Sequence, residues 1–153
     1  MPVPGDSALR VDTIMQQIKA KGGHVTLQRR LVVEALCASG GHPTIADIER
    51  HLQQQGMSIS ETTIYRILES LKDLQMVSPT DMGASGIVYS LLDTPPHHHG
   101  ICLDCGAIFD LDDSYFADLR QRLDDNLGFQ ARIDHMAIYG LCRQCAQQAA
   151  SKE

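Results

Sequence analysis

Apolar residues recur every three or four positions in four stretches of the first half of the chain, which is the spacing of amphipathic helices. Glycines or helix-capping residues separate these stretches, for example Gly22 and Gly23 after the first stretch and Thr26 before the second. Thr44 and Asp47 resemble a capping box at the start of the third stretch. The pattern predicts helices over 9–21, 27–38, 44–55 and 60–74, after a short polar lead over residues 1–6.

The fourth predicted helix has two unlike faces. Ile64, Ile67 and Leu71 belong to the apolar face, and the segment from Ser58 to Glu61 has the pattern of a capping box. With the preceding helix and the turn between them, this segment predicts a helix-turn-helix that binds DNA, and a plain amphipathic surface helix is the alternative. The polar face carries side chains that can reach base edges and phosphates in a major groove, namely Thr62, Thr63, Tyr65, Arg66 and Glu69.

A hairpin and a hinge follow the helices. Residues 76–80 and 87–91 flank a glycine-bearing loop and predict the hairpin, which would be the wing of a winged helix. Two successive prolines in Leu92–Pro96 predict an extended, stiff connection at a domain boundary. Beyond it, the pattern predicts strands around 101–103 and 107–111, a helix over 114–126 and a strand over 130–139.

The expected fold class is therefore α+β, with two small domains in one chain. The first, over residues 1–91, is a winged helix-turn-helix DNA-binding domain, and residues 92–96 form the hinge. The second, over 97–153, is a small α/β domain for dimerisation and metal binding. Each domain alone has a thin core, for which bound metal and dimerisation are the usual remedies.

The net charge of the chain does not identify its binding partner. The chain has a formal net charge of −6, and the second half holds most of the acidic excess. A net negative charge does not favour binding of nucleic acid, but contacts with phosphates depend on whether one face of the protein is locally basic. No segment approaches the length needed to span a membrane, and the polar lead carries no apolar run. These features predict a soluble, cytoplasmic protein without a membrane partner.

Four cysteines stand in two pairs with two residues inside each pair, Cys102 with Cys105 and Cys142 with Cys145. This spacing lets both thiolates of a turn reach one ion, and two such pairs supply the four sulfur ligands of a closed tetrahedral zinc site. Two disulfides or a thioredoxin-like redox pair are the alternatives, which a chain without a secretory signal makes less favourable. The prediction is a structural zinc site with four cysteine ligands.

Three successive histidines precede the first cysteine pair. In an extended strand His97 and His99 share a face and can bind one ion together, whereas His98 points away and is expected to be exposed to solvent. His42 precedes Pro43 and could be either a ligand or a residue at a helix start. Cys37, on an apolar helix face, is expected to be an inert buried thiol.

The motifs together resemble those of the ferric uptake regulator family. The segments that carry the resemblance are 26–29 in the second predicted helix, 62–66 in the recognition helix, 97–106 after the hinge, and 138–145 at the second cysteine pair. The resemblance implies a homodimeric repressor that binds a palindromic operator of double-stranded DNA when a regulatory divalent metal is present. It also implies that Cys102, Cys105, Cys142 and Cys145 hold structural zinc, that Tyr65 and Arg66 meet DNA, and that His42, His97, His99 and Asp110 hold the regulatory metal.

Two departures from the family pattern bear on metal binding. Many members place a carboxylate or thiolate just before the hinge, where this chain has Ser90. A further metal site in some members would need ligands at the positions of Pro96, His98 and Asp134 or His135, with another carboxylate in the helix over 114–126, and only part of that set is present. Nitrogen and oxygen ligands suit Fe(II), Zn(II), Mn(II) or Ni(II) at the regulatory site.

Two other functions compete with metal-dependent regulation. Three histidines and a carboxylate could form an open catalytic metal site. No activated nucleophile, phosphate loop or His-Glu-x-x-His pattern accompanies them, so neither catalysis nor a small-molecule substrate is expected. A redox switch, in which oxidation of Cys102 and Cys105 releases zinc, is compatible with the regulator.

Overall fold

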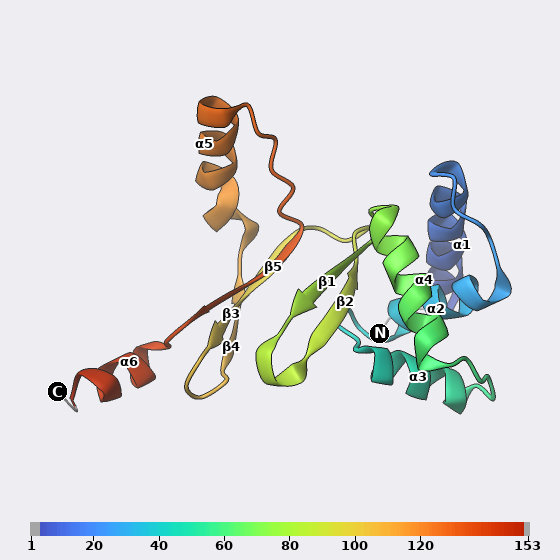
Figure 1. Cartoon of the computed structure of the whole chain (residues 1–153), viewed down its shortest axis with the longest axis horizontal. Helices are drawn as coiled ribbons and strands as arrows, with labels where there is room; N and C mark the ends of the chain where they lie inside the picture. The colour runs from blue at the N-terminus through green and yellow to red at the C-terminus, as the bar shows by residue number, and fades with distance from the viewer. Residues whose placement is uncertain (1–3, 152–153) are drawn as a thin grey trace. The chain divides into compact units, whose positions relative to one another are not determined.

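The computed structural model describes the backbone of residues 4–151 and the side chains of residues 8–151. Its elements are helices followed by two small sheets, which confirms the α+β class (Figure 1). The chain divides into two compact units. The first unit runs to Pro79 and includes Ile87–Thr94, and the second comprises Thr80–Gly86 and the chain from Pro95 onward.

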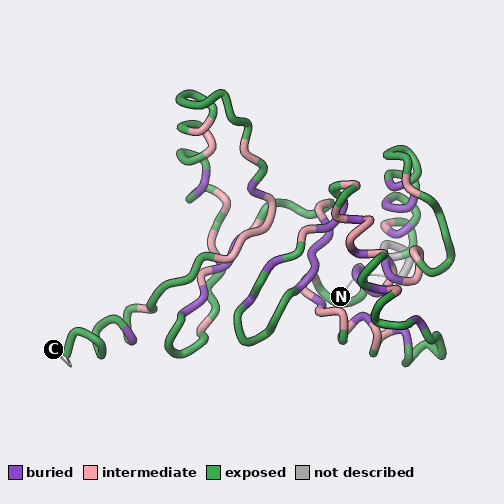
Figure 2. Tube along the Cα trace, viewed as in Figure 1, coloured by how far each residue is buried: buried purple, intermediate pink, exposed green. Residues whose placement is uncertain are grey.

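The first unit is built on four helices whose apolar faces form one core. Ile64, Leu68 and Leu71 of the fourth helix are fully buried, as are Val32 and Val33 of the second. The buried stretches of these helices alternate with exposed ones along the trace (Figure 2). The helices are α1 (Pro4–Ala20), α2 (Leu27–Ala38), α3 (Ile45–Gln54) and α4 (Glu61–Asp73).

Side-chain caps are present at the starts of α2, α3 and α4. The hydroxyl of Thr26 accepts a hydrogen bond from the backbone of Arg29 at the start of α2, and Thr44 and Asp47 form the predicted capping box at α3. The predicted helix over 60–74 agrees with α4 to within one residue, but its cap is Ser60 and not Ser58, because the Ser60 hydroxyl accepts the bond from the N–H of Thr63.

The first helix is longer than predicted. It begins at Pro4, so the expected polar lead covers helix at residues 4–6, while residues 1–3 lie outside the described part of the chain. Proline suits the first turn because the missing N–H would have no partner inside the helix there. Gly22 ends the helix with a φ of 85°, a conformation that a residue with a side chain adopts at a cost.

The predicted hairpin is present as β1 (Val77–Asp81) and β2 (Ile87–Leu91), joined by a loop that contains the short 3₁₀ helix η1 (Gly83–Ser85). Gly83 and Gly86 both have positive φ in this loop. The glycines of the sequence pattern therefore allow the chain to reverse there.

The second unit has a three-stranded sheet in the order β4-β3-β5, with β3 at the centre. β3 pairs antiparallel with β4 and parallel with β5. The elements are β3 (His97–Cys102), β4 (Ile108–Leu111), the 3₁₀ helix η2 (Asp113–Phe116), α5 (Ala117–Leu127), β5 (His135–Gly140) and α6 (Arg143–Ala150).

The second unit also differs from the sequence prediction in its element bounds. β3 starts at His97, earlier than predicted, and β5 starts at His135, later than predicted, because the two strands pair only from His97 beside His135 to Cys102 beside Gly140. α6 was not predicted, since its alanines and glutamines favour helix but the segment contains no large apolar residue. No helix among residues 4–151 has the length and apolar character needed to cross a membrane.

Candidate metal centres and recognition helix

The four paired cysteines lie together in the second unit. Cys102 ends β3, Cys105 follows in the next turn, and Cys142 and Cys145 stand at the start of α6. Their four sulfur atoms lie within 4.8 Å of one another. The Sγ atoms of Cys105 and Cys142 are 3.9 Å apart. A zinc ion with sulfur ligands at about 2.3 Å in a tetrahedron requires sulfur atoms about 3.8 Å apart, so the cluster fits zinc.

Electrostatics around these sulfurs favours a bound cation. The backbone N–H of Cys142 donates to the Cys102 sulfur at 3.3 Å and, with the N–H groups of Cys105 and Asp104, lowers the pKa of Cys102 to about 6. The Asp104 carboxylate and the Cys142 thiol raise the pKa of Cys145. One sulfur is thus readily ionised. Further thiolates beside it would need a nearby positive charge to be stable, and a bound zinc ion would provide that charge.

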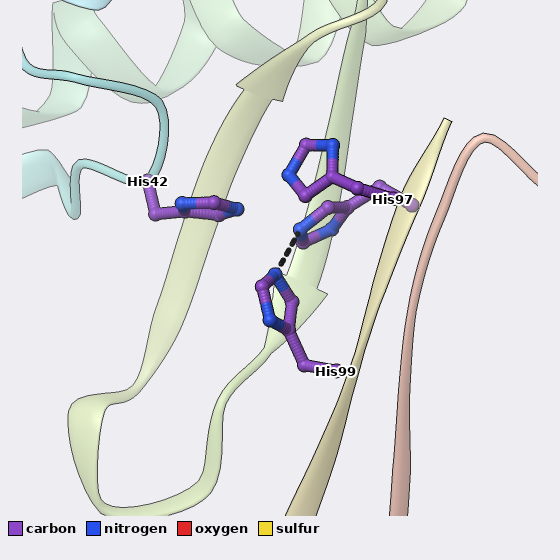
Figure 3. Close-up of side chains that lie close together, drawn as sticks. His42, His97 and His99 are labelled. Atoms are coloured by element: carbon purple, nitrogen blue, oxygen red, sulfur yellow. Dashed lines mark hydrogen bonds between the residues drawn. The ribbon is translucent and has the colours of Figure 1, made fainter. Parts of the chain in front are cut away.

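The predicted pair of regulatory histidines shares a face of β3. His97 and His99 extend to the same side of the strand (Figure 3). Asp110 of β4 stands opposite His99 in the antiparallel register, and its carboxylate lies 3.2 Å from Nδ1 of His99. The structure therefore brings together three of the four predicted regulatory residues.

His99 is suited to bind a metal as a neutral imidazole. Its side chain is buried, and this burial lowers its pKa, with the neighbouring His97 acting in the same direction and Asp110 opposing both. Neutral imidazole is the form that donates a lone pair to a metal ion. Asp110 lies on the Nδ1 side of the ring, while Nε2 faces His135.

His135 is a member of this cluster that the sequence reasoning did not assign to it. It lies beside His97 in the parallel register, and its Nε2 is 3.1 Å from Nε2 of His99. The ligand nitrogens of His97, His99 and His135 lie within 4.8 Å of one another. Its Nδ1 lies 2.5 Å from the Thr80 hydroxyl. Only the pairing of β3 with β5 reveals this neighbour, since 36 positions separate His99 from His135.

The expectation that His98 is exposed was wrong. It does point away from His97 and His99, but its side chain is fully buried, with Nε2 2.9 Å from Asp113 and the ring packed on Phe116. Arg120 also donates to Asp113 and, with His98, lowers the pKa of that carboxyl to about 2. The second face of β3 is covered by η2 and its neighbours, so it does not meet solvent.

His42 and Ser90 belong to the first unit. His42 is half-buried in the loop between α2 and α3, which β2 holds through a hydrogen bond from the Tyr89 N–H to the Pro43 carbonyl. The Ser90 side chain is buried, and its hydroxyl donates to the Gly41 carbonyl at 3.1 Å. Ser90 thus has a structural role in the loop that carries His42.

The polar face of α4 is exposed as predicted. Thr62, Tyr65 and Arg66 are open to solvent, with Tyr65 at 48% exposure, and they lie opposite the buried face of the helix. Thr63 is half-buried, and its hydroxyl lies 2.9 Å from that of the capping Ser60. Three of the four predicted DNA-contacting side chains are therefore accessible to a partner.

A family model described as "Ferric uptake regulator family" matches residues 20–139. The "Peroxide-responsive repressor PerR" of Staphylococcus saprophyticus is 30% identical over 136 residues, which covers 89% of this chain and 91% of that protein. The "Ferric uptake regulation protein" of Campylobacter jejuni is 28% identical and covers 91% and 92%. The solved structure of the Helicobacter pylori ferric uptake regulator Fur, reported to have three functional metal binding sites, is 26% identical with a TM-score of 0.66 and covers 89% and 93%.

Proposed function

Because this chain belongs to the ferric uptake regulator family, we propose that it is a metal-dependent, DNA-binding transcriptional repressor of metal-homeostasis or peroxide-stress genes. The observation that carries the proposal is the presence, in one chain of this family, of two separate clusters of metal-ligating side chains. A closed cluster of four sulfurs suits a permanent ion, and a cluster of imidazoles suits an exchangeable one. The relatives named as ferric uptake regulator and as peroxide-responsive repressor support the same class.

The cysteine cluster would hold the structural zinc through Cys102, Cys105, Cys142 and Cys145. Zinc supplies folding free energy there because the four ligands come from two segments that are 37 positions apart in the sequence between Cys105 and Cys142. The metal would fix the end of β3 to the start of α6.

The regulatory metal, Fe(II), Zn(II), Mn(II) or Ni(II), would be bound by His97 and His99 with Asp110 in the second unit and by His42 in the first. An ion that bonds to both units favours the arrangement in which all its ligands converge, and its differential affinity for that arrangement sets the size of the shift. We propose that this arrangement is the one that binds DNA.

The DNA partner would meet the exposed face of α4. Tyr65 and Arg66 would contact the operator, with Thr62 and Thr63 beside them, and the β1-β2 hairpin would be the wing. A double-stranded palindromic operator requires two such helices, one from each protomer of a homodimer. We infer that the protein works in the cytoplasm, where it can reach its operator.

The second unit supports the homodimer. α5 has an apolar stripe in its sequence, yet none of its residues is buried in the single chain, and Leu119 and Leu127 are exposed. Phe109 of β4 and Phe129 after α5 are exposed as well. Apolar side chains gathered in one small domain need a partner surface, and a second copy of the same domain provides one.

Regulation accounts for the helix-turn-helix, whereas the metalloenzyme alternative leaves it without a role, and the family consists of regulators. The redox switch remains compatible, and the relatives named as peroxide-responsive make peroxide a stimulus to test beside metal. Zinc release from the cysteine cluster after peroxide treatment is the measurement for that stimulus.

The test of the proposed function is a metal titration of operator affinity. The DNA is a duplex selected from a random pool by the metal-loaded wild-type protein. His97→Ala, His99→Ala and His42→Ala should each weaken metal-dependent binding while zinc content and dimer mass stay unchanged, because those histidines do not close the cysteine site. His24→Ala, at an exposed histidine before α2, is the matched control and should behave as wild type. Wild-type metal dependence of both His42→Ala and His99→Ala would overturn the assigned regulatory site.

A further inference from the structure

We propose that His135 is a ligand of the regulatory metal, so that the second unit presents three imidazoles to the ion, with Thr80 and Asp110 orienting two of them from behind. The inference rests on the regulatory metal proposed above and adds to that site a histidine that the family-based ligand set does not include. It follows from strand register, interatomic distances and the polar groups that lie on the far side of two of the rings.

Strand register places the three rings on one face. His97 and His99 are two positions apart on β3, so their side chains share a side, and the parallel register sets His135 beside His97. The position beside His99 on β5 is Ala137, whose small side chain leaves room for the imidazoles. The rings approach edge-on, with centroids 4.7 Å apart for His97 and His135 and 5.0 Å for His99 and His135.

The nitrogen spacing fits a shared ion. The Nε2 atoms of His99 and His135 are 3.1 Å apart. Two nitrogens bound to one zinc ion at about 2.0–2.1 Å in a tetrahedron lie about 3.3–3.4 Å apart. A higher coordination number reduces the angle between neighbouring ligands and brings the nitrogens slightly closer. A metal can therefore join these atoms with little movement of either ring.

Each of these two rings has a polar group beside its Nδ1 atom, on the side away from the cluster. The Thr80 hydroxyl lies 2.5 Å from Nδ1 of His135, and the Asp110 carboxylate lies 3.2 Å from Nδ1 of His99. In metal sites, a histidine ligand almost always gives its second nitrogen to such a partner, which fixes the tautomer and the ring orientation. Thr80 is itself buried, so its hydroxyl keeps a fixed position on β1.

His135 would also supply a metal ligand that Ser90 does not. A neutral serine hydroxyl is a weak ligand, and the Ser90 hydroxyl is already bonded to the Gly41 carbonyl. In this proposal Asp110 lies on the Nδ1 side of His99 and is not itself a ligand, in contrast to the ligand set that the family resemblance implies, so the second unit offers imidazoles to the ion. Imidazole suits zinc, iron and nickel, whereas Mn(II) is better matched by carboxylate, so the site should favour the former group.

The experiment titrates Co(II) into the full-length protein with its cysteine-bound zinc in place, and follows the visible absorption bands of cobalt. His97→Ala and His135→Ala should each weaken Co(II) binding by more than about a hundredfold. Thr80→Val, which keeps the shape of the side chain but removes the hydroxyl, should cost about 10- to 100-fold, and Thr80→Ser should restore binding. His135→Asp supplies a carboxylate in place of the imidazole, so it should recover part of the Co(II) binding and let Mn(II) compete better than in wild type.

Circular dichroism, zinc content and dimer mass establish that each variant is folded, and His135→Gln replaces His135→Ala if the alanine variant is not. Wild-type Co(II) affinity and bands in a folded His135 variant, together with loss in His97→Ala, would overturn the role of His135 and leave the proposed function intact. Wild-type Co(II) binding in both variants would instead show that the regulatory ion lies elsewhere, which would remove the basis of both proposals. Loss in His97→Ala and His135→Ala but not in His24→Ala would support the three-imidazole site.

Discussion

Replacement of Arg66 by alanine offers the sharpest test of the recognition face. Arg66 is exposed on α4, and the buried side of the same helix is formed by Ile64, Leu68 and Leu71, so the substitution should leave the fold and both metal clusters unchanged. The substitution should therefore change only the affinity of α4 for its partner. The two possible partners of a guanidinium on DNA, a base edge and a phosphate, predict different changes.

The expected loss of operator affinity depends on the number of Arg66 side chains that contact the DNA. A good contact to a base is worth about 1–3 kcal/mol, and a homodimer on a palindrome presents two copies of Arg66, so the loss should be about 2–6 kcal/mol if the two sites are independent. At about 1.4 kcal/mol for each factor of ten, this equals a fall in affinity of about 30-fold to about 10⁴-fold. If Arg66 contacts phosphate instead, affinity should become less dependent on salt. The magnitude of the negative slope of log affinity against log salt concentration should decrease by about 0.9 for each lost contact, which is about 1.8 for the dimer.

The assay is fluorescence anisotropy with the selected operator duplex at several salt concentrations and saturating metal. Arg122→Ala is the matched control, because Arg122 is also exposed and helical, but it lies on α5 in the second unit and pairs with Asp118. It removes the same charge and should change affinity little. If Arg66→Ala matches Arg122→Ala in affinity and in salt slope, α4 does not contact the operator through this residue, and the proposed recognition face is wrong.

Two further outcomes are expected. Cys102→Ser should abolish tight zinc retention and leave an unstable or monomeric protein, measured by zinc content and sedimentation, whereas Cys37→Ser should keep its zinc; a folded, dimeric Cys102→Ser protein without zinc would contradict the structural role. The pKa of Asp113 is lowered to about 2 by Arg120 and His98, so its interactions stabilise the fold above the ordinary aspartate pKa of about 3.9 and are lost as pH falls toward 2. Asp113→Asn should therefore destabilise the protein at neutral pH and flatten the fall in melting temperature between about pH 4 and pH 2; an unchanged acid profile would show that this carboxyl is not linked to folding.

Features that depend only on neighbours in the chain could be predicted from the amino-acid sequence. The caps at Thr26 and Thr44 join groups three residues apart, and the helical spacing of apolar residues needs only the geometry of one helix. The cysteine pairs are visible for the same reason, because each pair closes within one turn, and the shared face of His97 and His99 follows from the period of a single strand. Such features do not depend on where the rest of the chain lies.

Features that depend on which strands pair, and on which elements cover them, became visible only in the folded chain. The extents of β3 and β5 were missed because each strand runs only as far as its partner, and His98 is buried because η2 packs on the face opposite His97. His135 reaches the histidine cluster only through the parallel register of β5 beside β3. A shift of one residue in that register would turn its side chain to the other face, and no periodicity within β5 sets the register, because it results from packing between segments far apart in the sequence.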